Sequence, residues 1–130
     1  MNEKIIEIRK PTQKQTVAAI KSGDFSEVEK IEDTARQEAA KVFHAVASGS
    51  VLLIWYELPP VRCQSGAVSV MRYALHRSTK QSGFLQLSCM ELKNGQIIPT
   101  SDRQYNVSDA GFSEFFRDLP RSVNANFLEQ

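Results

Sequence analysis

Cysteine and histidine are the residues of this chain with the most reactive side chains, and Cys63 has the setting closest to that of a nucleophile. It follows Arg62, and a neighbouring cation favours the thiolate form that attacks an electrophile. A nucleophilic cysteine also needs a base within hydrogen-bond reach, and His76 is the candidate for that role. Cys89 lies in an apolar segment, which is typical of a small buried side chain. We predict a non-enzymatic protein, with a Cys63-based reaction as the enzymatic alternative.

The chain lacks the patterns that hold metals and cofactors. Zinc sites need several cysteine or histidine ligands at short fixed spacings, whereas Cys63 and Cys89 are 26 positions apart. His44 and His76 belong to different predicted elements. The six glycines stand singly at predicted turns and form no phosphate-binding cluster. We therefore predict no catalytic residue, no metal site and no cofactor.

Charge is segregated along the chain, although its formal net charge is only +1. Residues 24–38 contain six acids and two bases, whereas residues 58–93 contain five bases and one acid. Acids near a helix start and bases in hairpins have a plain explanation in the helix dipole and in solubility. The functional explanation is an acidic helix that binds a protein, or a basic sheet that binds a polyanion.

Two groups of residues are therefore candidate binding sites. The first group is for protein binding, through the acidic helix or an exposed sheet edge, with the aromatic face of the last helix as a further contact for a second copy or a partner: Glu27, Glu29, Glu32, Asp33, Phe112 and Phe116. The second is a nucleic-acid site, in which arginine and lysine side chains contact phosphates and a tyrosine ring stacks on a nucleobase: Arg62, Arg72, Tyr73, Arg77 and Lys80. A net charge of +1 is low for a dedicated nucleic-acid binder, which favours the protein-binding site.

The periodicity of apolar residues changes at Ser48-Gly49-Ser50, which marks the predicted boundary between helix and sheet. Before it, apolar residues recur at steps of three, four and seven, which predicts a long amphipathic helix over residues 24–48. Asp24 or Ser26 is its N-cap, and Ser26 with Glu29 matches the S-x-x-E capping box. After the boundary, apolar runs rich in β-branched and aromatic residues predict three strands, at 51–58, 67–75 and 84–92.

Turn residues indicate that the strands form an antiparallel meander. Pro59-Pro60 ends the first strand, because neither proline can donate a backbone hydrogen bond. Asn94-Gly95 predicts a type I′ hairpin turn, since both residues tolerate positive φ. A fourth strand begins at Ile97, and Pro99 either shortens it or places it at an edge.

The two ends of the chain are predicted from shorter patterns. Residues 4–9 form a strand that Pro11 ends, and it stays open whether this strand joins the sheet. A short helix follows, with Gly23 as its C-terminal cap. Ser108 caps a C-terminal helix over residues 108–119, whose apolar face is aromatic.

The predicted fold is α+β, with one long N-terminal helix packed on a three- to four-stranded antiparallel meander and a short C-terminal helix. It forms a single domain over residues 1–130, because 130 residues suffice for one core. Residues 1–23 hold an initial strand and a short helix, and residues 24–48 form the main helix. Residues 51–99 form the sheet, and residues 108–119 form the C-terminal helix.

These patterns predict a small cytoplasmic protein-binding domain, an adaptor, inhibitor or accessory subunit that can self-associate as a homodimer. The N-terminus lacks the apolar core of an export signal. The longest apolar run, residues 51–56, is far shorter than the roughly 20 residues of a membrane span. The expected partner is another protein or a second copy of the chain. Nucleic acid is the alternative partner, and no membrane contact is expected.

Overall fold

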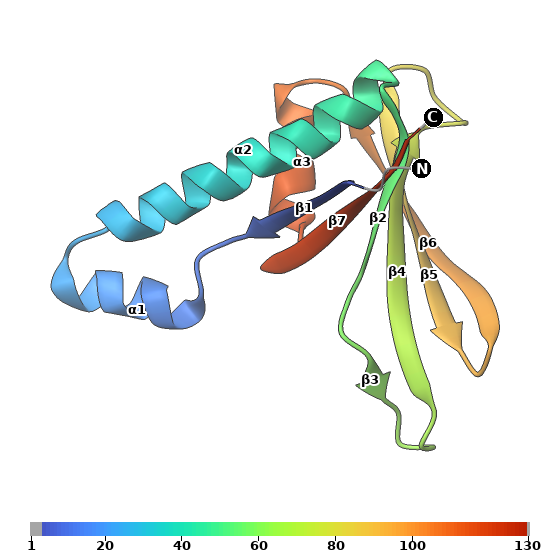
Figure 1. Cartoon of the computed structure of the whole chain (residues 1–130), viewed down its shortest axis with the longest axis horizontal. Coiled ribbons are helices and arrows are strands. Elements are labelled where there is room, and N and C mark those ends of the chain that lie inside the picture. The colour runs from blue at the N-terminus through green and yellow to red at the C-terminus, as the bar shows by residue number, and fades with distance from the viewer. Residues whose placement is uncertain (1–3, 130) are drawn as a thin grey trace.

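Residues 4–129 are described by a computed structural model, which contains one antiparallel sheet and three helices (Figure 1). The strands are β1 (Lys4–Arg9), β2 (Val51–Glu57), β3 (Val61–Arg62), β4 (Val68–Arg77), β5 (Phe84–Lys93), β6 (Gln96–Asn106) and β7 (Ser122–Glu129). The helices are α1 (Gln13–Ser22), α2 (Ser26–Ser48) and α3 (Asp109–Asp118). Neighbouring strands follow the order β1-β7-β2-β4-β5-β6, and the short β3 pairs with β4.

The predicted fold, one long helix on a three- to four-stranded meander with a short C-terminal helix, is wrong. The sheet has seven strands, because β1 joins it, the short β3 pairs with β4, and the C-terminal segment adds β7 between β1 and β2. Val123, Ala125 and Phe127 of β7 alternate into the core. Since β1 and β7 come from opposite ends of the chain, no hairpin turn connects them, and the sequence contains no local signal of their pairing.

Strand β6 is the outermost strand beside β5 and runs through Pro99 instead of ending there. Pro99 lies opposite Met90, next to a bulge where the register of the two strands shifts. An edge strand tolerates proline, because the missing N–H can lie on its unpaired side. Asn94 and Gly95 connect β5 to β6 with φ of 53° and 74°, the two positive values that the predicted turn requires.

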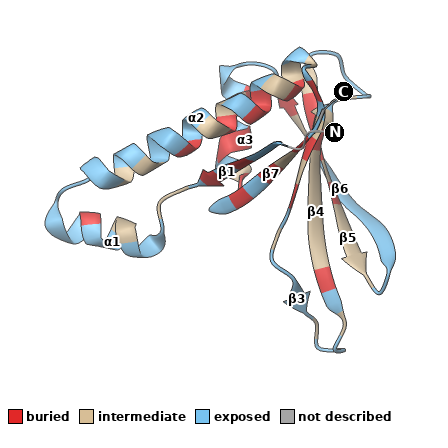
Figure 2. Cartoon of the chain, in the orientation of Figure 1, coloured by how far each residue is buried: buried red, intermediate tan, exposed pale blue. Residues whose placement is uncertain are grey.

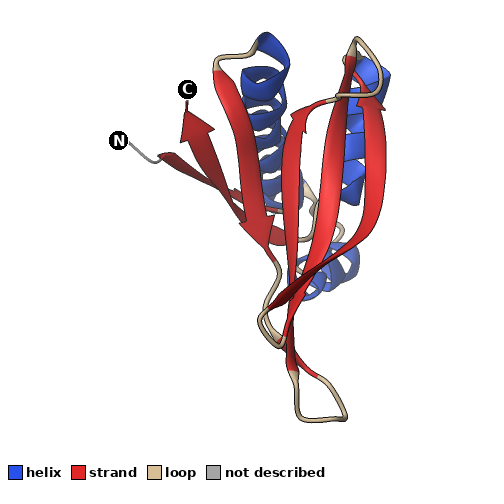
Figure 3. Ribbon diagram, turned by 90° about the vertical axis from the view of Figure 1, so that its right-hand side faces the viewer, coloured by secondary structure: helices blue, strands red, loops and turns tan. Residues whose placement is uncertain are grey.

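The hydrophobic core lies between one face of the sheet and the helices α2 and α3, which share that face (Figure 3). Val42, Phe43 and Val46 of α2 are fully buried, and the core cluster that contains them includes Ile54 and Leu75 of the central strands. Their steps of three and four place them on one stripe of the helix. Among the described elements, no helix covers the opposite face of the sheet (Figure 3).

Helix α3 closes one side of this core. Ser108 caps it as predicted, since its Oγ accepts a hydrogen bond from the Gly111 amide at 3.1 Å. A Cβ atom at Gly111 would lie 1.7 Å from the carbonyl oxygen of Asn106, so the approach of α3 to the end of β6 requires glycine. Phe115 and Phe116 are buried on the inner side of the helix.

Two parts of the chain extend beyond the core (Figures 1 and 2). The buried residues of α2 begin at Ala35, and before that point α2 projects to one side together with α1. We call residues 13–34 the helical arm. In another direction, β3 and the adjoining ends of β4, β5 and β6 extend past the helices, and we call residues 59–72 and 90–101 the β extension. None of the described helices is long and apolar enough to cross a membrane.

Candidate protein-binding surface

Helix α1 has well-formed ends and a largely exposed body. Thr12 Oγ1 accepts a hydrogen bond from the Gln15 amide at 3.1 Å, and the Thr12 amide donates to Gln15 Oε1 at 2.9 Å. This reciprocal pair is a capping box. Gly23 ends the helix at φ 75°, as predicted. Ala19 is the buried residue of α1, so most of its ten residues lie at the surface.

Three large apolar side chains of the helical arm are exposed. Val17 and Ile20 lie three positions apart on α1, and Phe25 lies in the turn before α2. Single apolar side chains are common on protein surfaces, whereas a group of them on one projection is typical of an interaction site. A ten-residue helix is also marginal by itself, because fewer than about 12 to 15 residues rarely offset the cost of nucleation.

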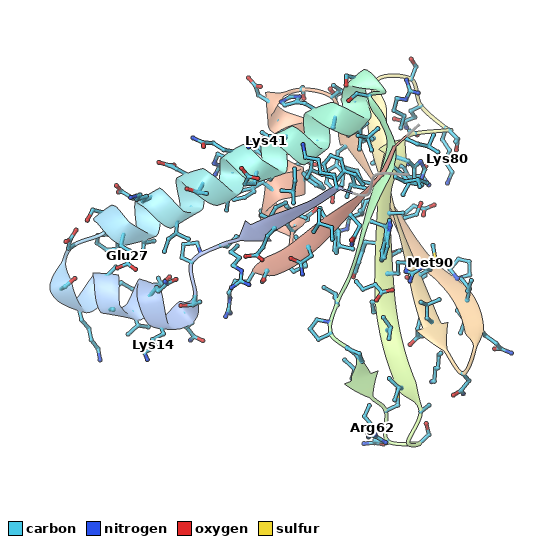
Figure 4. The ribbon with its side chains drawn as sticks, viewed as in Figure 1. Lys14, Glu27, Lys41, Arg62, Lys80 and Met90 are labelled. Atoms are coloured by element: carbon cyan, nitrogen blue, oxygen red, sulfur yellow. The ribbon has the colours of Figure 1, made fainter. Side chains whose placement is uncertain are left out.

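Helix α1 leaves a cleft on each side of its contact with α2. One cleft, of about 390 Å³, is lined by Ala18 and Val28 between Lys14 of α1 and Glu27 of α2 (Figure 4). The other, of about 400 Å³, lies between β1, α1 and α2, with Ile31 among its apolar lining residues. The two helices of the arm are therefore less closely packed than α2 and the sheet.

The start of α2 differs from the prediction. Phe25 occupies the N-cap position and its side chain makes no capping hydrogen bond. Asp24 orders the turn instead, because its Oδ1 accepts hydrogen bonds from the Ser26 amide at 3.0 Å and from Ser26 Oγ at 2.7 Å. These hydrogen bonds hold the pKa of the Asp24 carboxyl below its ordinary value. The predicted Ser26–Glu29 capping box is absent.

The acidic residues of the predicted protein-binding site all lie on the helical arm. They are exposed along the beginning of α2: Glu27, Glu29, Glu32 and Asp33. Glu32 lies 4.0 Å from Arg36, measured from Oε1 to Nη2. Within residues 4–129 the other three acids form no ion pair, and neither do Lys14 and Lys21 of α1. Helix α1 therefore carries only basic charges and the beginning of α2 mainly acidic ones, and most of these groups form no ion pair within residues 4–129.

Phe112 and Phe116, the aromatic part of the same predicted site, face the core from α3. Phe116 is only 5% exposed, and the Arg36 guanidinium lies 4.6 Å from its ring centroid. The Phe112 ring packs edge-on against Phe43, with 5.6 Å between centroids. Phe116 is therefore buried and Phe112 partly buried, and Arg36 connects the Phe116 ring to Glu32 of the acidic segment.

The residues of the predicted nucleic-acid site are spread over both faces of the sheet. Arg72 and Tyr73 are consecutive in β4, so their side chains point to opposite faces. Arg72 Nε donates to Glu57 Oε1 at 2.8 Å, and Lys80 Nζ lies 3.5 Å from Asp102 Oδ2. Two of the four bases are therefore already paired with carboxylates.

The remaining two bases are also apart. Arg62 belongs to β3 at the far end of the β extension, whereas Arg77 is the last residue of β4 and lies at the opposite end of that strand, as does Lys80 in the turn after it (Figure 4). Arg77 is directed toward Gly49, where its Nη1 lies 3.1 Å from the position of a Cβ atom. The five residues do not form one basic surface.

The predicted nucleophile and base are separated along β4. The Cys63 amide donates to the Ala67 carbonyl at 2.8 Å, in the turn before β4. His76 lies near the other end of this strand, about 26 Å from Val68 at the usual strand rise of ~3.3 Å per residue. His76 Nε2 lies 3.2 Å from Ser88 Oγ. The described residues contain no group of three or more side chains suited to a metal ion.

A small pocket of about 230 Å³ lies between the sheet and the end of α3. Tyr56 and Tyr73 stack there with ring centroids 5.0 Å apart, and burial raises the pKa of Tyr56. Asp118 accepts hydrogen bonds from Tyr105 Oη at 2.7 Å and Arg103 Nη1 at 2.8 Å. Burial acts to raise the pKa of Asp118, but these hydrogen bonds outweigh it and lower the value. The charges of this pocket are balanced internally, and they join β6 to α3.

The residues that the sequence prediction missed are Val17, Ile20 and Phe25. It places Val17 and Ile20 in a short helix and gives them no role at the surface. Their signal in the sequence is a spacing of three on a helix that is too short to be stable alone.

No protein-family profile matches this chain, and no curated protein or solved structure is significantly similar to it. The proposals below therefore rest on the contacts, burial and charges of the chain itself.

Proposed function

We propose that this chain is a small, non-enzymatic, cytoplasmic protein-binding domain, an adaptor, inhibitor or accessory subunit, which contacts its partner through the helical arm. One observation carries the proposal: the arm projects from the core and exposes Val17, Ile20 and Phe25 among charged side chains. Apolar side chains within a polar rim are the usual composition of a protein interface.

The build of the arm supports a macromolecular partner over a small ligand. Helix α1 buries one residue and leaves clefts of about 390 and 400 Å³ beside it, both open to the surface. An apolar side chain from a partner protein fits clefts of this kind, and its burial adds packing that a marginal helix lacks. The acids at the start of α2 supply the polar rim, and they set the charge of the partner.

The nucleic-acid alternative has no comparable support. A phosphate backbone is bound by several unpaired bases on one surface. Here Arg72 is paired with Glu57 and Lys80 with Asp102, and Arg72 lies on the opposite face from Tyr73.

Affinity capture with matched variants tests the proposal. Ile20 in the helical arm and Ile97 in the β extension expose 64% and 66% of their surfaces, so Ile97→Asp is a control for Ile20→Asp. We expect proteins captured from a host lysate after nuclease treatment to be retained by wild type and Ile97→Asp and lost with Ile20→Asp. Equal capture by all three baits, or loss of capture on nuclease treatment, would contradict a protein-binding arm.

A further inference from the structure

We infer that the partner of the helical arm is a second copy of this chain, with α1 of each copy packed along the beginning of α2 of the other around a two-fold axis. This inference rests on the proposed protein-binding function and names its partner. It is carried by the distribution of charge on the arm, by its exposed apolar residues and by the small size of α1.

The two helices of the arm carry opposite charge. Helix α1 contains Lys14 and Lys21 and no acid. Residues 24–33 contain five acids and one base, Lys30. A purely basic partner that contacts both helices would be repelled by α1, and a purely acidic one by the start of α2. A second arm turned by a two-fold rotation places its basic helix on the acidic segment and its acidic segment on the basic helix.

A two-fold contact also matches the position of the apolar residues. Val17 lies three positions from Lys14 and four from Lys21, on the same side of α1 as both lysines. Ile20 is three positions from Val17 and adjacent to Lys21 in the sequence. Phe25 lies at the tip of the arm, between the basic helix and the acidic segment. An isologous contact buries each of these three side chains twice and closes at two copies.

The size of the arm limits the strength of the contact. Helix α1 has ten residues and is about 15 Å long at 1.5 Å per residue. Two such arms form an interface below the standard size of tight complexes, so we expect a dissociation constant in roughly the micromolar range. Each α1 then belongs to a four-helix arrangement in place of a loosely packed pair.

Sedimentation equilibrium of the full chain, from about 1 to about 200 µM, measures the contact directly. We expect a monomer–dimer equilibrium for wild type, and a dissociation constant raised more than about tenfold by Ile20→Asp. Ile97→Asp, equally exposed but on the β extension, should leave the constant unchanged. Circular dichroism of each variant verifies that the fold is kept. A monomer throughout this range, or equal weakening by both substitutions, overturns the inference.

Charge exchange between two variants tests the arrangement of the helices. One variant carries Lys14→Glu and Lys21→Glu, and the other carries Glu27→Lys, Glu29→Lys and Asp33→Lys. Each alone brings like charges together in the dimer and should be monomeric, whereas an equimolar mixture should form a heterodimer. Loss of a contact within one arm cannot be restored by mixing. When circular dichroism shows that both variants keep the helix content of wild type, a mixture that stays monomeric overturns the crossed packing of α1 on α2.

These outcomes separate the inference from the proposed function. A monomeric chain whose captured partner is lost with Ile20→Asp rejects the dimer and keeps the protein-binding arm. A chain that dimerises through another surface, with Ile20→Asp without effect on dimerisation or capture, rejects both.

Discussion

The helical arm and the β extension both project from the core, but their polar groups are satisfied in different ways. In the β extension, β4 and β5 remain paired to their ends, from Ser69 opposite Lys93. Ser69 Oγ also donates to Glu91 Oε2 at 2.6 Å. In the helical arm, α1 packs against the beginning of α2, and the charges of Lys14 and Lys21 have no partner among the described residues.

Exposed apolar surface alone does not distinguish these projections. Ile20 on the arm and Ile97 on the extension are exposed to nearly the same degree. The extension continues the hydrogen-bond ladder of the sheet, so its backbone is held by the same strands that form the core. The arm is a short helix pair beyond the end of the core, and this is why we assign the binding role to the arm.

The largest expected effect tests whether the core supports both projections. Phe43 is fully buried, with the rings of Phe112 and Phe115 at 5.6 and 5.4 Å. We expect Phe43→Ala to lower the free energy of unfolding by about 3 to 5 kcal/mol, through lost burial and a cavity. Ile20→Ala and Ile97→Ala should each change it by less than about 0.5 kcal/mol.

Urea unfolding at low protein concentration measures these values, because dimerisation would otherwise add a concentration-dependent term. A loss with Ile20→Ala close to that with Phe43→Ala would mean that the arm is an integral part of the core. The helical arm would then not be a projection separate from the core, in contrast to the β extension.

A smaller effect is expected at the hydrogen bonds that join β6 to α3. Asp118→Ala leaves the hydroxyl of the buried Tyr105 without its acceptor, so we expect a loss of about 1 to 3 kcal/mol at neutral pH. Asp102→Ala is the matched control on the exposed part of β6, where the Lys80 ion pair spans 3.5 Å and both side chains are exposed. Its cost should stay below about 1 kcal/mol.

The pH dependence of the same pair of variants sharpens this prediction. The pKa of Asp118 is lower in the folded chain than its ordinary value, so the unfolded state binds a proton more readily. The contribution of the Asp118 carboxylate to the free energy of unfolding is therefore complete above the ordinary carboxyl pKa of about 4. It is lost as the pH falls through the lower pKa that Asp118 has in the folded chain. Wild type and Asp118→Ala should converge in stability below about pH 4. A constant difference down to pH 2 would indicate that the carboxylate charge does not matter.

Local sequence patterns were sufficient for the elements that contact their sequence neighbours. The change of periodicity at residues 48–50 coincides with the end of α2 and the start of β2. Gly23, Asn94 and Gly95 adopt the positive φ values that their predicted roles require. These features depend on side chains and turns within a few residues of each other, and a single sequence contains that information.

Strand β7 shows what local patterns do not contain. Val123, Ala125 and Phe127 alternate into the core, but Asn124 and Asn126 between them are poor strand formers. Its partner β1 is more than a hundred residues away. The arm was missed for a related reason, since the apolar stripe of α2 continues through Ile31, beyond the place where the buried residues of the helix begin. The periodicity of a helix shows which of its faces is apolar, but it does not show how far along the helix the sheet covers that face.

The smallest expected effect compares the turns of the two projections. Gly23 in the arm and Gly95 in the extension have φ of 75° and 74°, and a Cβ atom at either position meets nothing within 4 Å. Alanine therefore costs about 1 kcal/mol at both positions through backbone strain alone. In the arm this cost falls on a helix that opens locally, so Gly23→Ala should speed hydrogen exchange of the α1 amides about fivefold and leave β4 unchanged.

In the extension the same strain belongs to a ladder that opens with the sheet, so Gly95→Ala should lower the global stability that the slowest β4 amides report. Hydrogen exchange followed by NMR distinguishes the two variants amide by amide. Faster exchange in β4 of Gly23→Ala would mean that the arm unfolds only together with the core. If the arm is instead an independent unit that a second copy stabilises, the exchange of its α1 amides slows as the protein concentration rises, and exchange in the extension does not.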